Sequence, residues 1–156
     1  MRNVQIDVLA EDDPQEDCGV RFSNEWRFQD SPGQAHKGRI DLPARETYVL
    51  RFHLRDESSR NLKFSPPGVN AMWVTSGSDN APPECPSNAG DGGQIKFSGP
   101  QTGCSKNLLA VINANSGDPC LLKYALRFDG DPHKSESGQQ YPPYVFDPEI
   151  KNGGSN

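Results

Sequence analysis

Alternation of apolar and polar residues is the feature of this 156-residue chain that most restricts its fold. Between residues 118 and 131, Leu122, Tyr124, Leu126 and Phe128 are separated by single polar or small residues. Successive side chains of a β-strand point to opposite faces, so this period of two predicts a strand with one buried face. The period recurs along the chain and no helical period competes with it, which predicts an all-β protein.

The alternating stretches predict about eight to ten strands with little helix. The chain holds 15 glycines and 14 prolines, and these are spread between the stretches as turn residues. Strands are expected near residues 4–8, 18–28, 38–42, 47–55, 61–65, 71–76, 94–98, 107–115, 120–128 and 144–146. Short strands with frequent turns are typical of an antiparallel β-sandwich, which is the fold we predict.

Two strands carry the clearest pattern, and they predict which side chains form the core. We expect Leu50 and Phe52 to be buried together with Tyr124, Leu126 and Phe128. Residues on the opposite parity are expected to face solvent; these are Arg51, Lys123 and Arg127. We therefore predict that residues 118–131 belong to the scaffold and not to a binding site.

The order of the strands is predicted from the connections. Four residues separate the strands at 107–115 and 120–128, a length that favours a β-hairpin. Up-and-down connection of successive strands is expected for the others. No repeat or second domain is visible, so residues 1–148 are predicted to form one domain and residues 149–156 a fraying C-terminal tail.

Several segments taken together resemble a family. These are LKFSPPGVNAMWV, CP, LLAVINANSGDPCLLKYALRF and YVFDPEIKNGG, with Asp147, Pro148, Ile150 and Asn152 as the terminal pattern. In this order they resemble small uncharacterised bacterial all-β proteins with a cupredoxin-like or immunoglobulin-like sandwich. The resemblance covers roughly residues 47–154. It implies a fold and no particular activity.

The charge of the chain bears on its partners. The formal net charge is -5 and no basic cluster is present, so we expect neither nucleic acid nor an anionic membrane surface as a partner. No apolar run is long enough for a transmembrane helix, and the N-terminus does not resemble a signal peptide. A cytoplasmic location is the default expectation, and removal of an export signal stays open.

The resemblance to cupredoxin-like proteins suggests a copper site. A blue-copper site needs two histidines and a cysteine, but His36, His53 and His133 lie in separate segments without a nearby cysteine. No Cys-x-x-Cys pair indicates zinc. The acidic residues within 11–17 and the DGDPH stretch at 129–133 lack the ligand spacing of a calcium loop. We therefore expect no cofactor.

The four cysteines allow a disulfide prediction that depends on the up-and-down strand order. That order places Cys18 and Cys104 at one end of the sandwich and Cys85 and Cys120 at the other. Cys85–Cys120 and Cys18–Cys104 are then the allowed pairs. Cys104–Cys120 is excluded, because the strand between them would separate the two by about 30 Å. Four reduced thiols are the alternative for a chain without an export signal.

The sequence does not specify a function. It contains no nucleophile elbow, phosphate-binding loop or zinc-protease motif. We expect a non-enzymatic binding or structural module. Its oligomeric state and its partner are unknown, and a protein is among the candidate partners. The alternatives are a metal-binding or redox cupredoxin relative with unorthodox ligands, and a hydrolase with a carboxylate pair.

The long irregular stretch at residues 77–93 is the candidate binding loop, since binding residues concentrate on loops held by a rigid scaffold. A disordered excursion is the alternative interpretation of this stretch. Its polar candidates are Asp79, Asn80, Glu84, Asn88 and Asp91.

Overall fold

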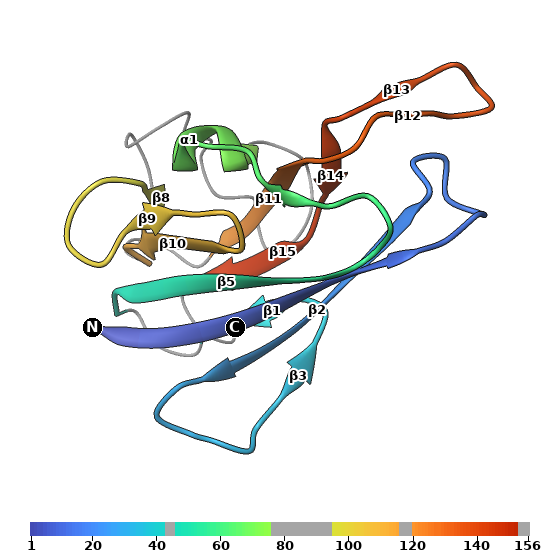
Figure 1. The fold of residues 1–156 in the computed structure, drawn as a ribbon. Coiled ribbons are helices and arrows are strands. Elements are labelled where there is room, and N and C mark those ends of the chain that lie inside the picture. Colours follow the sequence, from blue (N-terminus) through green and yellow to red (C-terminus); the bar gives the residue numbers. More distant parts are fainter. Residues whose placement is uncertain (43–45, 76–94, 116–119, 153–156) are drawn as a thin grey trace.

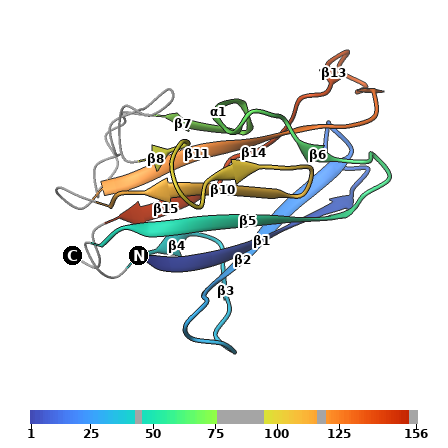
Figure 2. The same ribbon diagram turned by 60° about the vertical axis from the view of Figure 1, so that its left-hand side comes forward.

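The structure is a computed structural model that describes residues 1–42, 46–75, 95–115 and 120–152. These residues form an all-β protein with two mixed sheets and a single helical turn, α1 (Gly68–Ala71). Figures 1 and 2 show the two sheets stacked, with the long strands β1 and β5 in one and β11 in the other. The all-β prediction is confirmed.

The first sheet is built around three long strands. Its order is β3 (His36–Lys37), β2 (Val20–Phe28), β1 (Arg2–Asp12), β5 (Tyr48–Glu57), β10 (Leu108–Asn113) and β8 (Ile95–Lys96), and β9 (Gly103–Cys104) also pairs with β10. β1 and β5 are parallel, whereas β2 and β10 are antiparallel to their neighbours.

The second sheet is organised around β11. Its order is β14 (Tyr144–Phe146), β11 (Cys120–Asp129), β15 (Glu149–Asn152) and β4 (Ile40–Asp41), and β6 (Lys63–Phe64) and β7 (Met72–Thr75) also pair with β11. β15 and β4 are parallel. A separate ribbon consists of β12 (His133–Lys134) and β13 (Gln140–Tyr141).

The alternating pattern of the sequence determines the core between the sheets. Leu50, Phe52, Tyr124, Leu126 and Phe128 are all buried, with the Phe52 and Tyr124 rings 5.7 Å apart across the two sheets. The residues of opposite parity are each partly exposed; these are Arg51, Lys123 and Arg127. The predicted register of both strands is confirmed.

The predicted strand order is wrong in two respects. The sheets are mixed and not purely antiparallel, because β5 pairs with β1 in parallel. β10 and β11 do not form a hairpin but lie in different sheets. Alternation fixes which face of a strand is buried and leaves its neighbour undetermined, so a short connection alone did not identify the pairing. The exclusion of a Cys104–Cys120 pair loses its basis, since it assumed this hairpin.

The predicted C-terminal tail is too long. β15 occupies Glu149–Asn152 and pairs antiparallel with β11, and Ile150 is fully buried. The last apolar side chain of the chain therefore belongs to the core, and the domain continues past residue 148. Among the described residues, no helix is long and apolar enough to cross a membrane.

Candidate binding cleft

A cleft of about 970 Å³ lies beside β2, between the first sheet and the β14–β15 segment of the second. Its lining includes Phe22 and Asn24 of β2, Tyr124 of β11 and Phe146 of β14. The segments that join β3 to β4 and β14 to β15 complete the walls. The cleft is therefore assembled from parts of the chain more than 100 positions apart.

Two buried polar side chains in this cleft lack a full set of partners. Asn24 is 6% exposed and Tyr124 is 2% exposed. The Asn24 Oδ1 accepts a hydrogen bond from the Gly38 N–H at 3.1 Å. Within the described part of the chain, however, the Asn24 Nδ2 and the Tyr124 hydroxyl have no hydrogen-bond partner. Buried polar atoms are rarely left unpaired in folded proteins, so these two atoms call for an explanation.

The protonation of Tyr124 decides what its hydroxyl offers. Burial raises the pKa of Tyr124 well above that of a free tyrosine, because the phenolate would be desolvated. The hydroxyl therefore stays protonated at neutral pH and offers one donor together with acceptor lone pairs. The Asn24 Nδ2 offers donors only. Each of the two groups therefore has an unused hydrogen-bond donor within the described chain.

The wall next to Asn24 is held in place by Trp26. The Trp26 ring stacks on His36 with centroids 4.4 Å apart, and its Nε1–H donates to the Arg39 carbonyl at 3.1 Å. Between them, Gly38 has a φ of +77°, a conformation that side-chain-bearing residues rarely adopt. These contacts fix residues 36–39 against β2 and so preserve the shape of the cleft.

Aromatic rings supply the apolar part of the lining. Phe22 stacks on Phe146 at 5.6 Å and on the buried Phe128 at 5.2 Å. Phe22 and Phe146 both stay partly exposed. An apolar group of a ligand can therefore pack on rings that the core already holds rigid.

Charges of both signs surround the cleft in similar numbers. The carboxylates are Asp7, Glu11, Glu25, Asp147 and Glu149, and the cations are Lys37, Arg39, Arg55 and Lys123. Several are already engaged with each other or with neighbours, as in the Lys37–Glu25 ion pair at 3.7 Å and the Arg39–Asp41 pair at 3.1 Å. A lining without a dominant sign favours a ligand of low net charge.

The binding candidates chosen from the sequence do not form this cleft. Asp79, Asn80, Glu84, Asn88 and Asp91 lie outside the described residues. Asn24 and Tyr124 were missed. Asn24 had a visible signal, because it is a polar residue at an inward position between Phe22 and Trp26. Tyr124 had none, since the tertiary structure decides whether its hydroxyl has a partner.

The cysteines are distributed over the whole molecule. Cys18 and Cys104 are free thiols, so the predicted pair between them is not formed in this structure. Cys18 belongs to the turn between β1 and β2, and Cys104 to β9 at the opposite end of the molecule in Figure 1. Cys85 lies outside the described residues, and the side chain of Cys120 is not described either. The Cys85–Cys120 pair therefore stays a prediction.

No metal centre is visible in the part of the chain that the structure describes, where no three His, Cys, Asp or Glu side chains gather for an ion. In the acidic turn, the Asp17 carboxylate instead accepts hydrogen bonds from the Ser137 hydroxyl at 3.1 Å and the Tyr141 hydroxyl at 3.3 Å. The Asp12 carboxylate accepts from the Ser59 N–H at 3.0 Å. These carboxylates connect neighbouring loops to each other.

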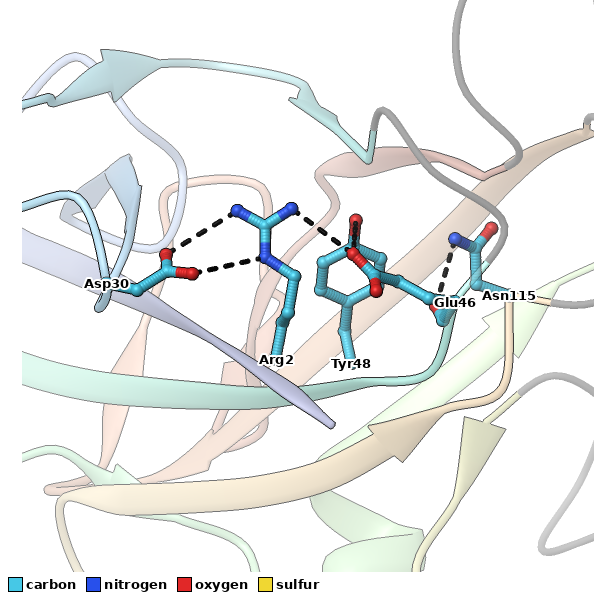
Figure 3. A network of polar contacts seen from close by, with 5 residues as sticks. All are labelled: Arg2, Asp30, Glu46, Tyr48 and Asn115. Atoms are coloured by element: carbon cyan, nitrogen blue, oxygen red, sulfur yellow. Dashed lines mark hydrogen bonds and ion pairs between the residues drawn. The ribbon is translucent and has the colours of Figure 1, made fainter.

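A second polar cluster, drawn in Figure 3, surrounds Arg2. The Arg2 guanidinium forms ion pairs with Asp30 at 3.4 Å and with Glu46 at 3.2 Å, and it lies 4.2 Å from the centre of the Phe28 ring. The Tyr48 hydroxyl donates to Glu46 at 3.4 Å. The cluster ties the start of β1 to the segments around β2 and β5, and we interpret it as structural.

A scan against protein-family models found no match for this chain, and a search of curated proteins found no matching relative.

Proposed function

We propose that this protein is a non-enzymatic binding module and that its ligand occupies the cleft beside β2. One observation carries the proposal: two side chains that line the same cleft, Asn24 and Tyr124, are at least 94% buried, and each has a buried polar atom without a partner among the described residues. A ligand that accepts hydrogen bonds from them would satisfy both atoms. The rigid aromatic lining and the mixed charges of the rim support a neutral ligand with both polar and apolar parts.

The partner classes follow from the same features. Because the chain has a net charge of -5 and the cleft has no excess of cations, we propose that the ligand is neither nucleic acid nor an anionic membrane surface. The finer fold assignment, cupredoxin-like or immunoglobulin-like, and a cytoplasmic location belong to the proposal as well. The fold assignment rests on the sequence resemblance, and the location is proposed as the default.

The two alternatives find less support in the cleft. For a metal-binding or redox protein, the described lining holds no histidine, and the ring of the neighbouring His36 is stacked on Trp26. For a hydrolase, the cleft supplies carboxylates, but Glu25 is ion-paired with Lys37 and Glu11 with Arg21 at 3.1 Å. A binding function requires no reactive histidine or carboxylate, so the residues that line the cleft are sufficient for it.

The test is a binding screen with three neutral probe classes: a pool of end-blocked hexapeptides, neutral oligosaccharides and uncharged nucleosides. We expect calorimetry to detect one class with the wild type. The affinity should fall roughly 2- to 12-fold in Tyr124→Phe, the effect of losing one neutral hydrogen bond. Asn70→Ala is the matched control, because Asn70 is an exposed residue of α1 outside the cleft lining.

The proposal fails if no probe class binds. It also fails if the bound probe has the same affinity for Tyr124→Phe as for the wild type, because the cleft would then not be the site.

A further inference from the structure

The free edge of β2 adds a second kind of unpaired group next to the cleft. β1 pairs with β2 from Val20 to Phe28 on one side. On the other side β3 pairs with β2 at Glu25 and Trp26, and in the described part of the chain no strand pairs with this side of residues 20–24. Alternate N–H and C=O groups of these residues therefore point away from β1. The Val20 carbonyl accepts a hydrogen bond from the Cys18 thiol at 3.2 Å, and no described strand pairs with the others.

The unpaired edge and the cleft coincide. Phe22, Ser23 and Asn24 belong to the unpaired stretch and also line the cleft. Phe22 and Asn24 have inward parity, and Ser23 has outward parity, since Phe22 pairs with the buried Ala10 and Asn24 with the buried Val8. The cleft thus borders the unpaired edge of β2, and side chains from both faces of β2 line the cleft.

From this coincidence we propose that the cleft binds an extended peptide segment of another protein, which adds to the first sheet as a strand beside residues 20–24 of β2. This inference rests on the proposed function and names its ligand class. The edge of β2 supplies the main-chain hydrogen bonds, and peptide carbonyls turned toward the cleft accept from the Asn24 Nδ2 and the Tyr124 hydroxyl. The main chain is neutral, in agreement with the balanced charges of the rim.

The surroundings of the open edge favour a single strand over a second copy of this chain. At one end, β3 covers β2 from Glu25 onward. At the other end, the β12–β13 ribbon is joined to the β1–β2 turn by the hydrogen bonds from Ser137 and Tyr141 to Asp17. Figure 1 shows β2 running between these two projections. The open stretch of five residues is about 17 Å long at 3.3 Å per residue, a length that suits a short extended segment.

The register of the added strand gives it a sequence preference. Its inward side chains would approach Phe22 and Phe146, and its outward side chains would lie beside Arg21 and Ser23. We therefore expect the bound segment to alternate apolar and polar residues, with at least one apolar side chain on the two rings.

The test begins with selection of random heptapeptides, displayed on phage, against the wild-type protein. Selected peptides are synthesised with blocked ends in three forms: unmodified, N-methylated at odd positions and N-methylated at even positions. Only alternate amides of an added strand face β2, so one methylated form should bind at least tenfold more weakly and the other within about threefold of the unmodified peptide. The two methylated forms are matched controls for each other.

Hydrogen exchange locates the contact on the protein. Peptide binding should slow exchange at alternate amides within residues 20–24 and leave α1 unchanged. Equal binding of both methylated forms, no protection on β2, or no selected peptide would overturn the inference. Light scattering that shows self-association through β2 would also overturn it, in favour of a second copy.

These experiments test the proposed function separately from the peptide inference. If the peptides fail but an oligosaccharide or a nucleoside binds in a manner that depends on Tyr124, the cleft is a binding site for another ligand. If no probe of any class binds, both the inference and the proposed function are wrong.

Discussion

Replacement of Tyr124 by phenylalanine removes one oxygen atom from the core and should stabilise the ligand-free protein. Tyr124 is 2% exposed, and its hydroxyl has no partner within the described chain. A buried polar group without a partner costs about 1–3 kcal/mol, so its removal should raise the free energy of unfolding by about this amount. The ring and its packing against Phe52 at 5.7 Å are unchanged by the substitution.

Tyr144 provides a matched control for the same chemical change. It is fully buried as well, but its hydroxyl donates to the Asp131 carbonyl at 2.7 Å. Tyr144→Phe deletes this hydrogen bond and should lower the free energy of unfolding by about 0.5–1.5 kcal/mol. The two tyrosines thus predict effects of opposite sign from one identical substitution.

Urea unfolding followed by circular dichroism measures both variants against the wild type. For a chain of this size, each kcal/mol of unfolding free energy changes the Tm by about 2–4 °C, so Tyr124→Phe should raise the Tm by about 2–12 °C in thermal unfolding. The slope of free energy against urea should stay constant, since the fold is unchanged. The reasoning is refuted if Tyr124→Phe destabilises the protein as Tyr144→Phe does, because the hydroxyl would then have a structural partner.

Four further predictions concern the core, the tyrosines, the cysteines and metals. Phe128→Ala should cost about 3–5 kcal/mol in urea unfolding because Phe128 is fully buried, whereas Val145→Ala at a 42% exposed position should change stability by less than about 0.5 kcal/mol; similar values for both would contradict the assigned register. The free energy of unfolding should fall as the pH rises above about 10, because tyrosines ionise there in the unfolded chain while burial raises the pKa of Tyr124 in the folded protein. This fall should be shallower in Tyr124→Phe. An unfolding midpoint that stays constant from pH 8 to 11 would be incompatible with this prediction. Mass spectrometry of unreduced peptides should find no crosslink between Cys18 and Cys104, which are free and lie at opposite ends of the molecule; such a crosslink would show that the arrangement of β9 is wrong. Prolonged chelation with EDTA should leave the Tm unchanged, and a loss that one specific ion restores would establish a structural metal.

The buried faces of the strands could be predicted from the sequence, but the order of the strands could not. In β1, Val4, Ile6 and Val8 alternate with polar residues, and all three are fully buried. The same alternation suits β1 whether its neighbour is parallel or antiparallel, because both arrangements bury one face. The parallel pairing of β1 with β5 depends on contacts distant in sequence, which a local pattern does not contain.

The candidate site was less predictable than the core for a related reason. A polar residue at an inward position is readable, and Asn24 between Phe22 and Trp26 was such a signal. The unpaired Tyr124 hydroxyl is a property of the assembled sheets, as is the free edge of β2. Composition points instead to residues 77–93, because a loop has a clear signature in the sequence, whereas a cleft depends on tertiary contacts.

The most direct test of the binding cleft is a two-dimensional ¹H–¹⁵N NMR titration of the wild-type protein with the end-blocked hexapeptide pool. The account predicts that the side-chain NH₂ signals of Asn24 and the backbone amides of Phe22 and Ser23 shift together and saturate, while the amide of Asn70 on α1 does not move. Saturating shifts confined to other surfaces, with the Asn24 side-chain signals unchanged, would contradict it.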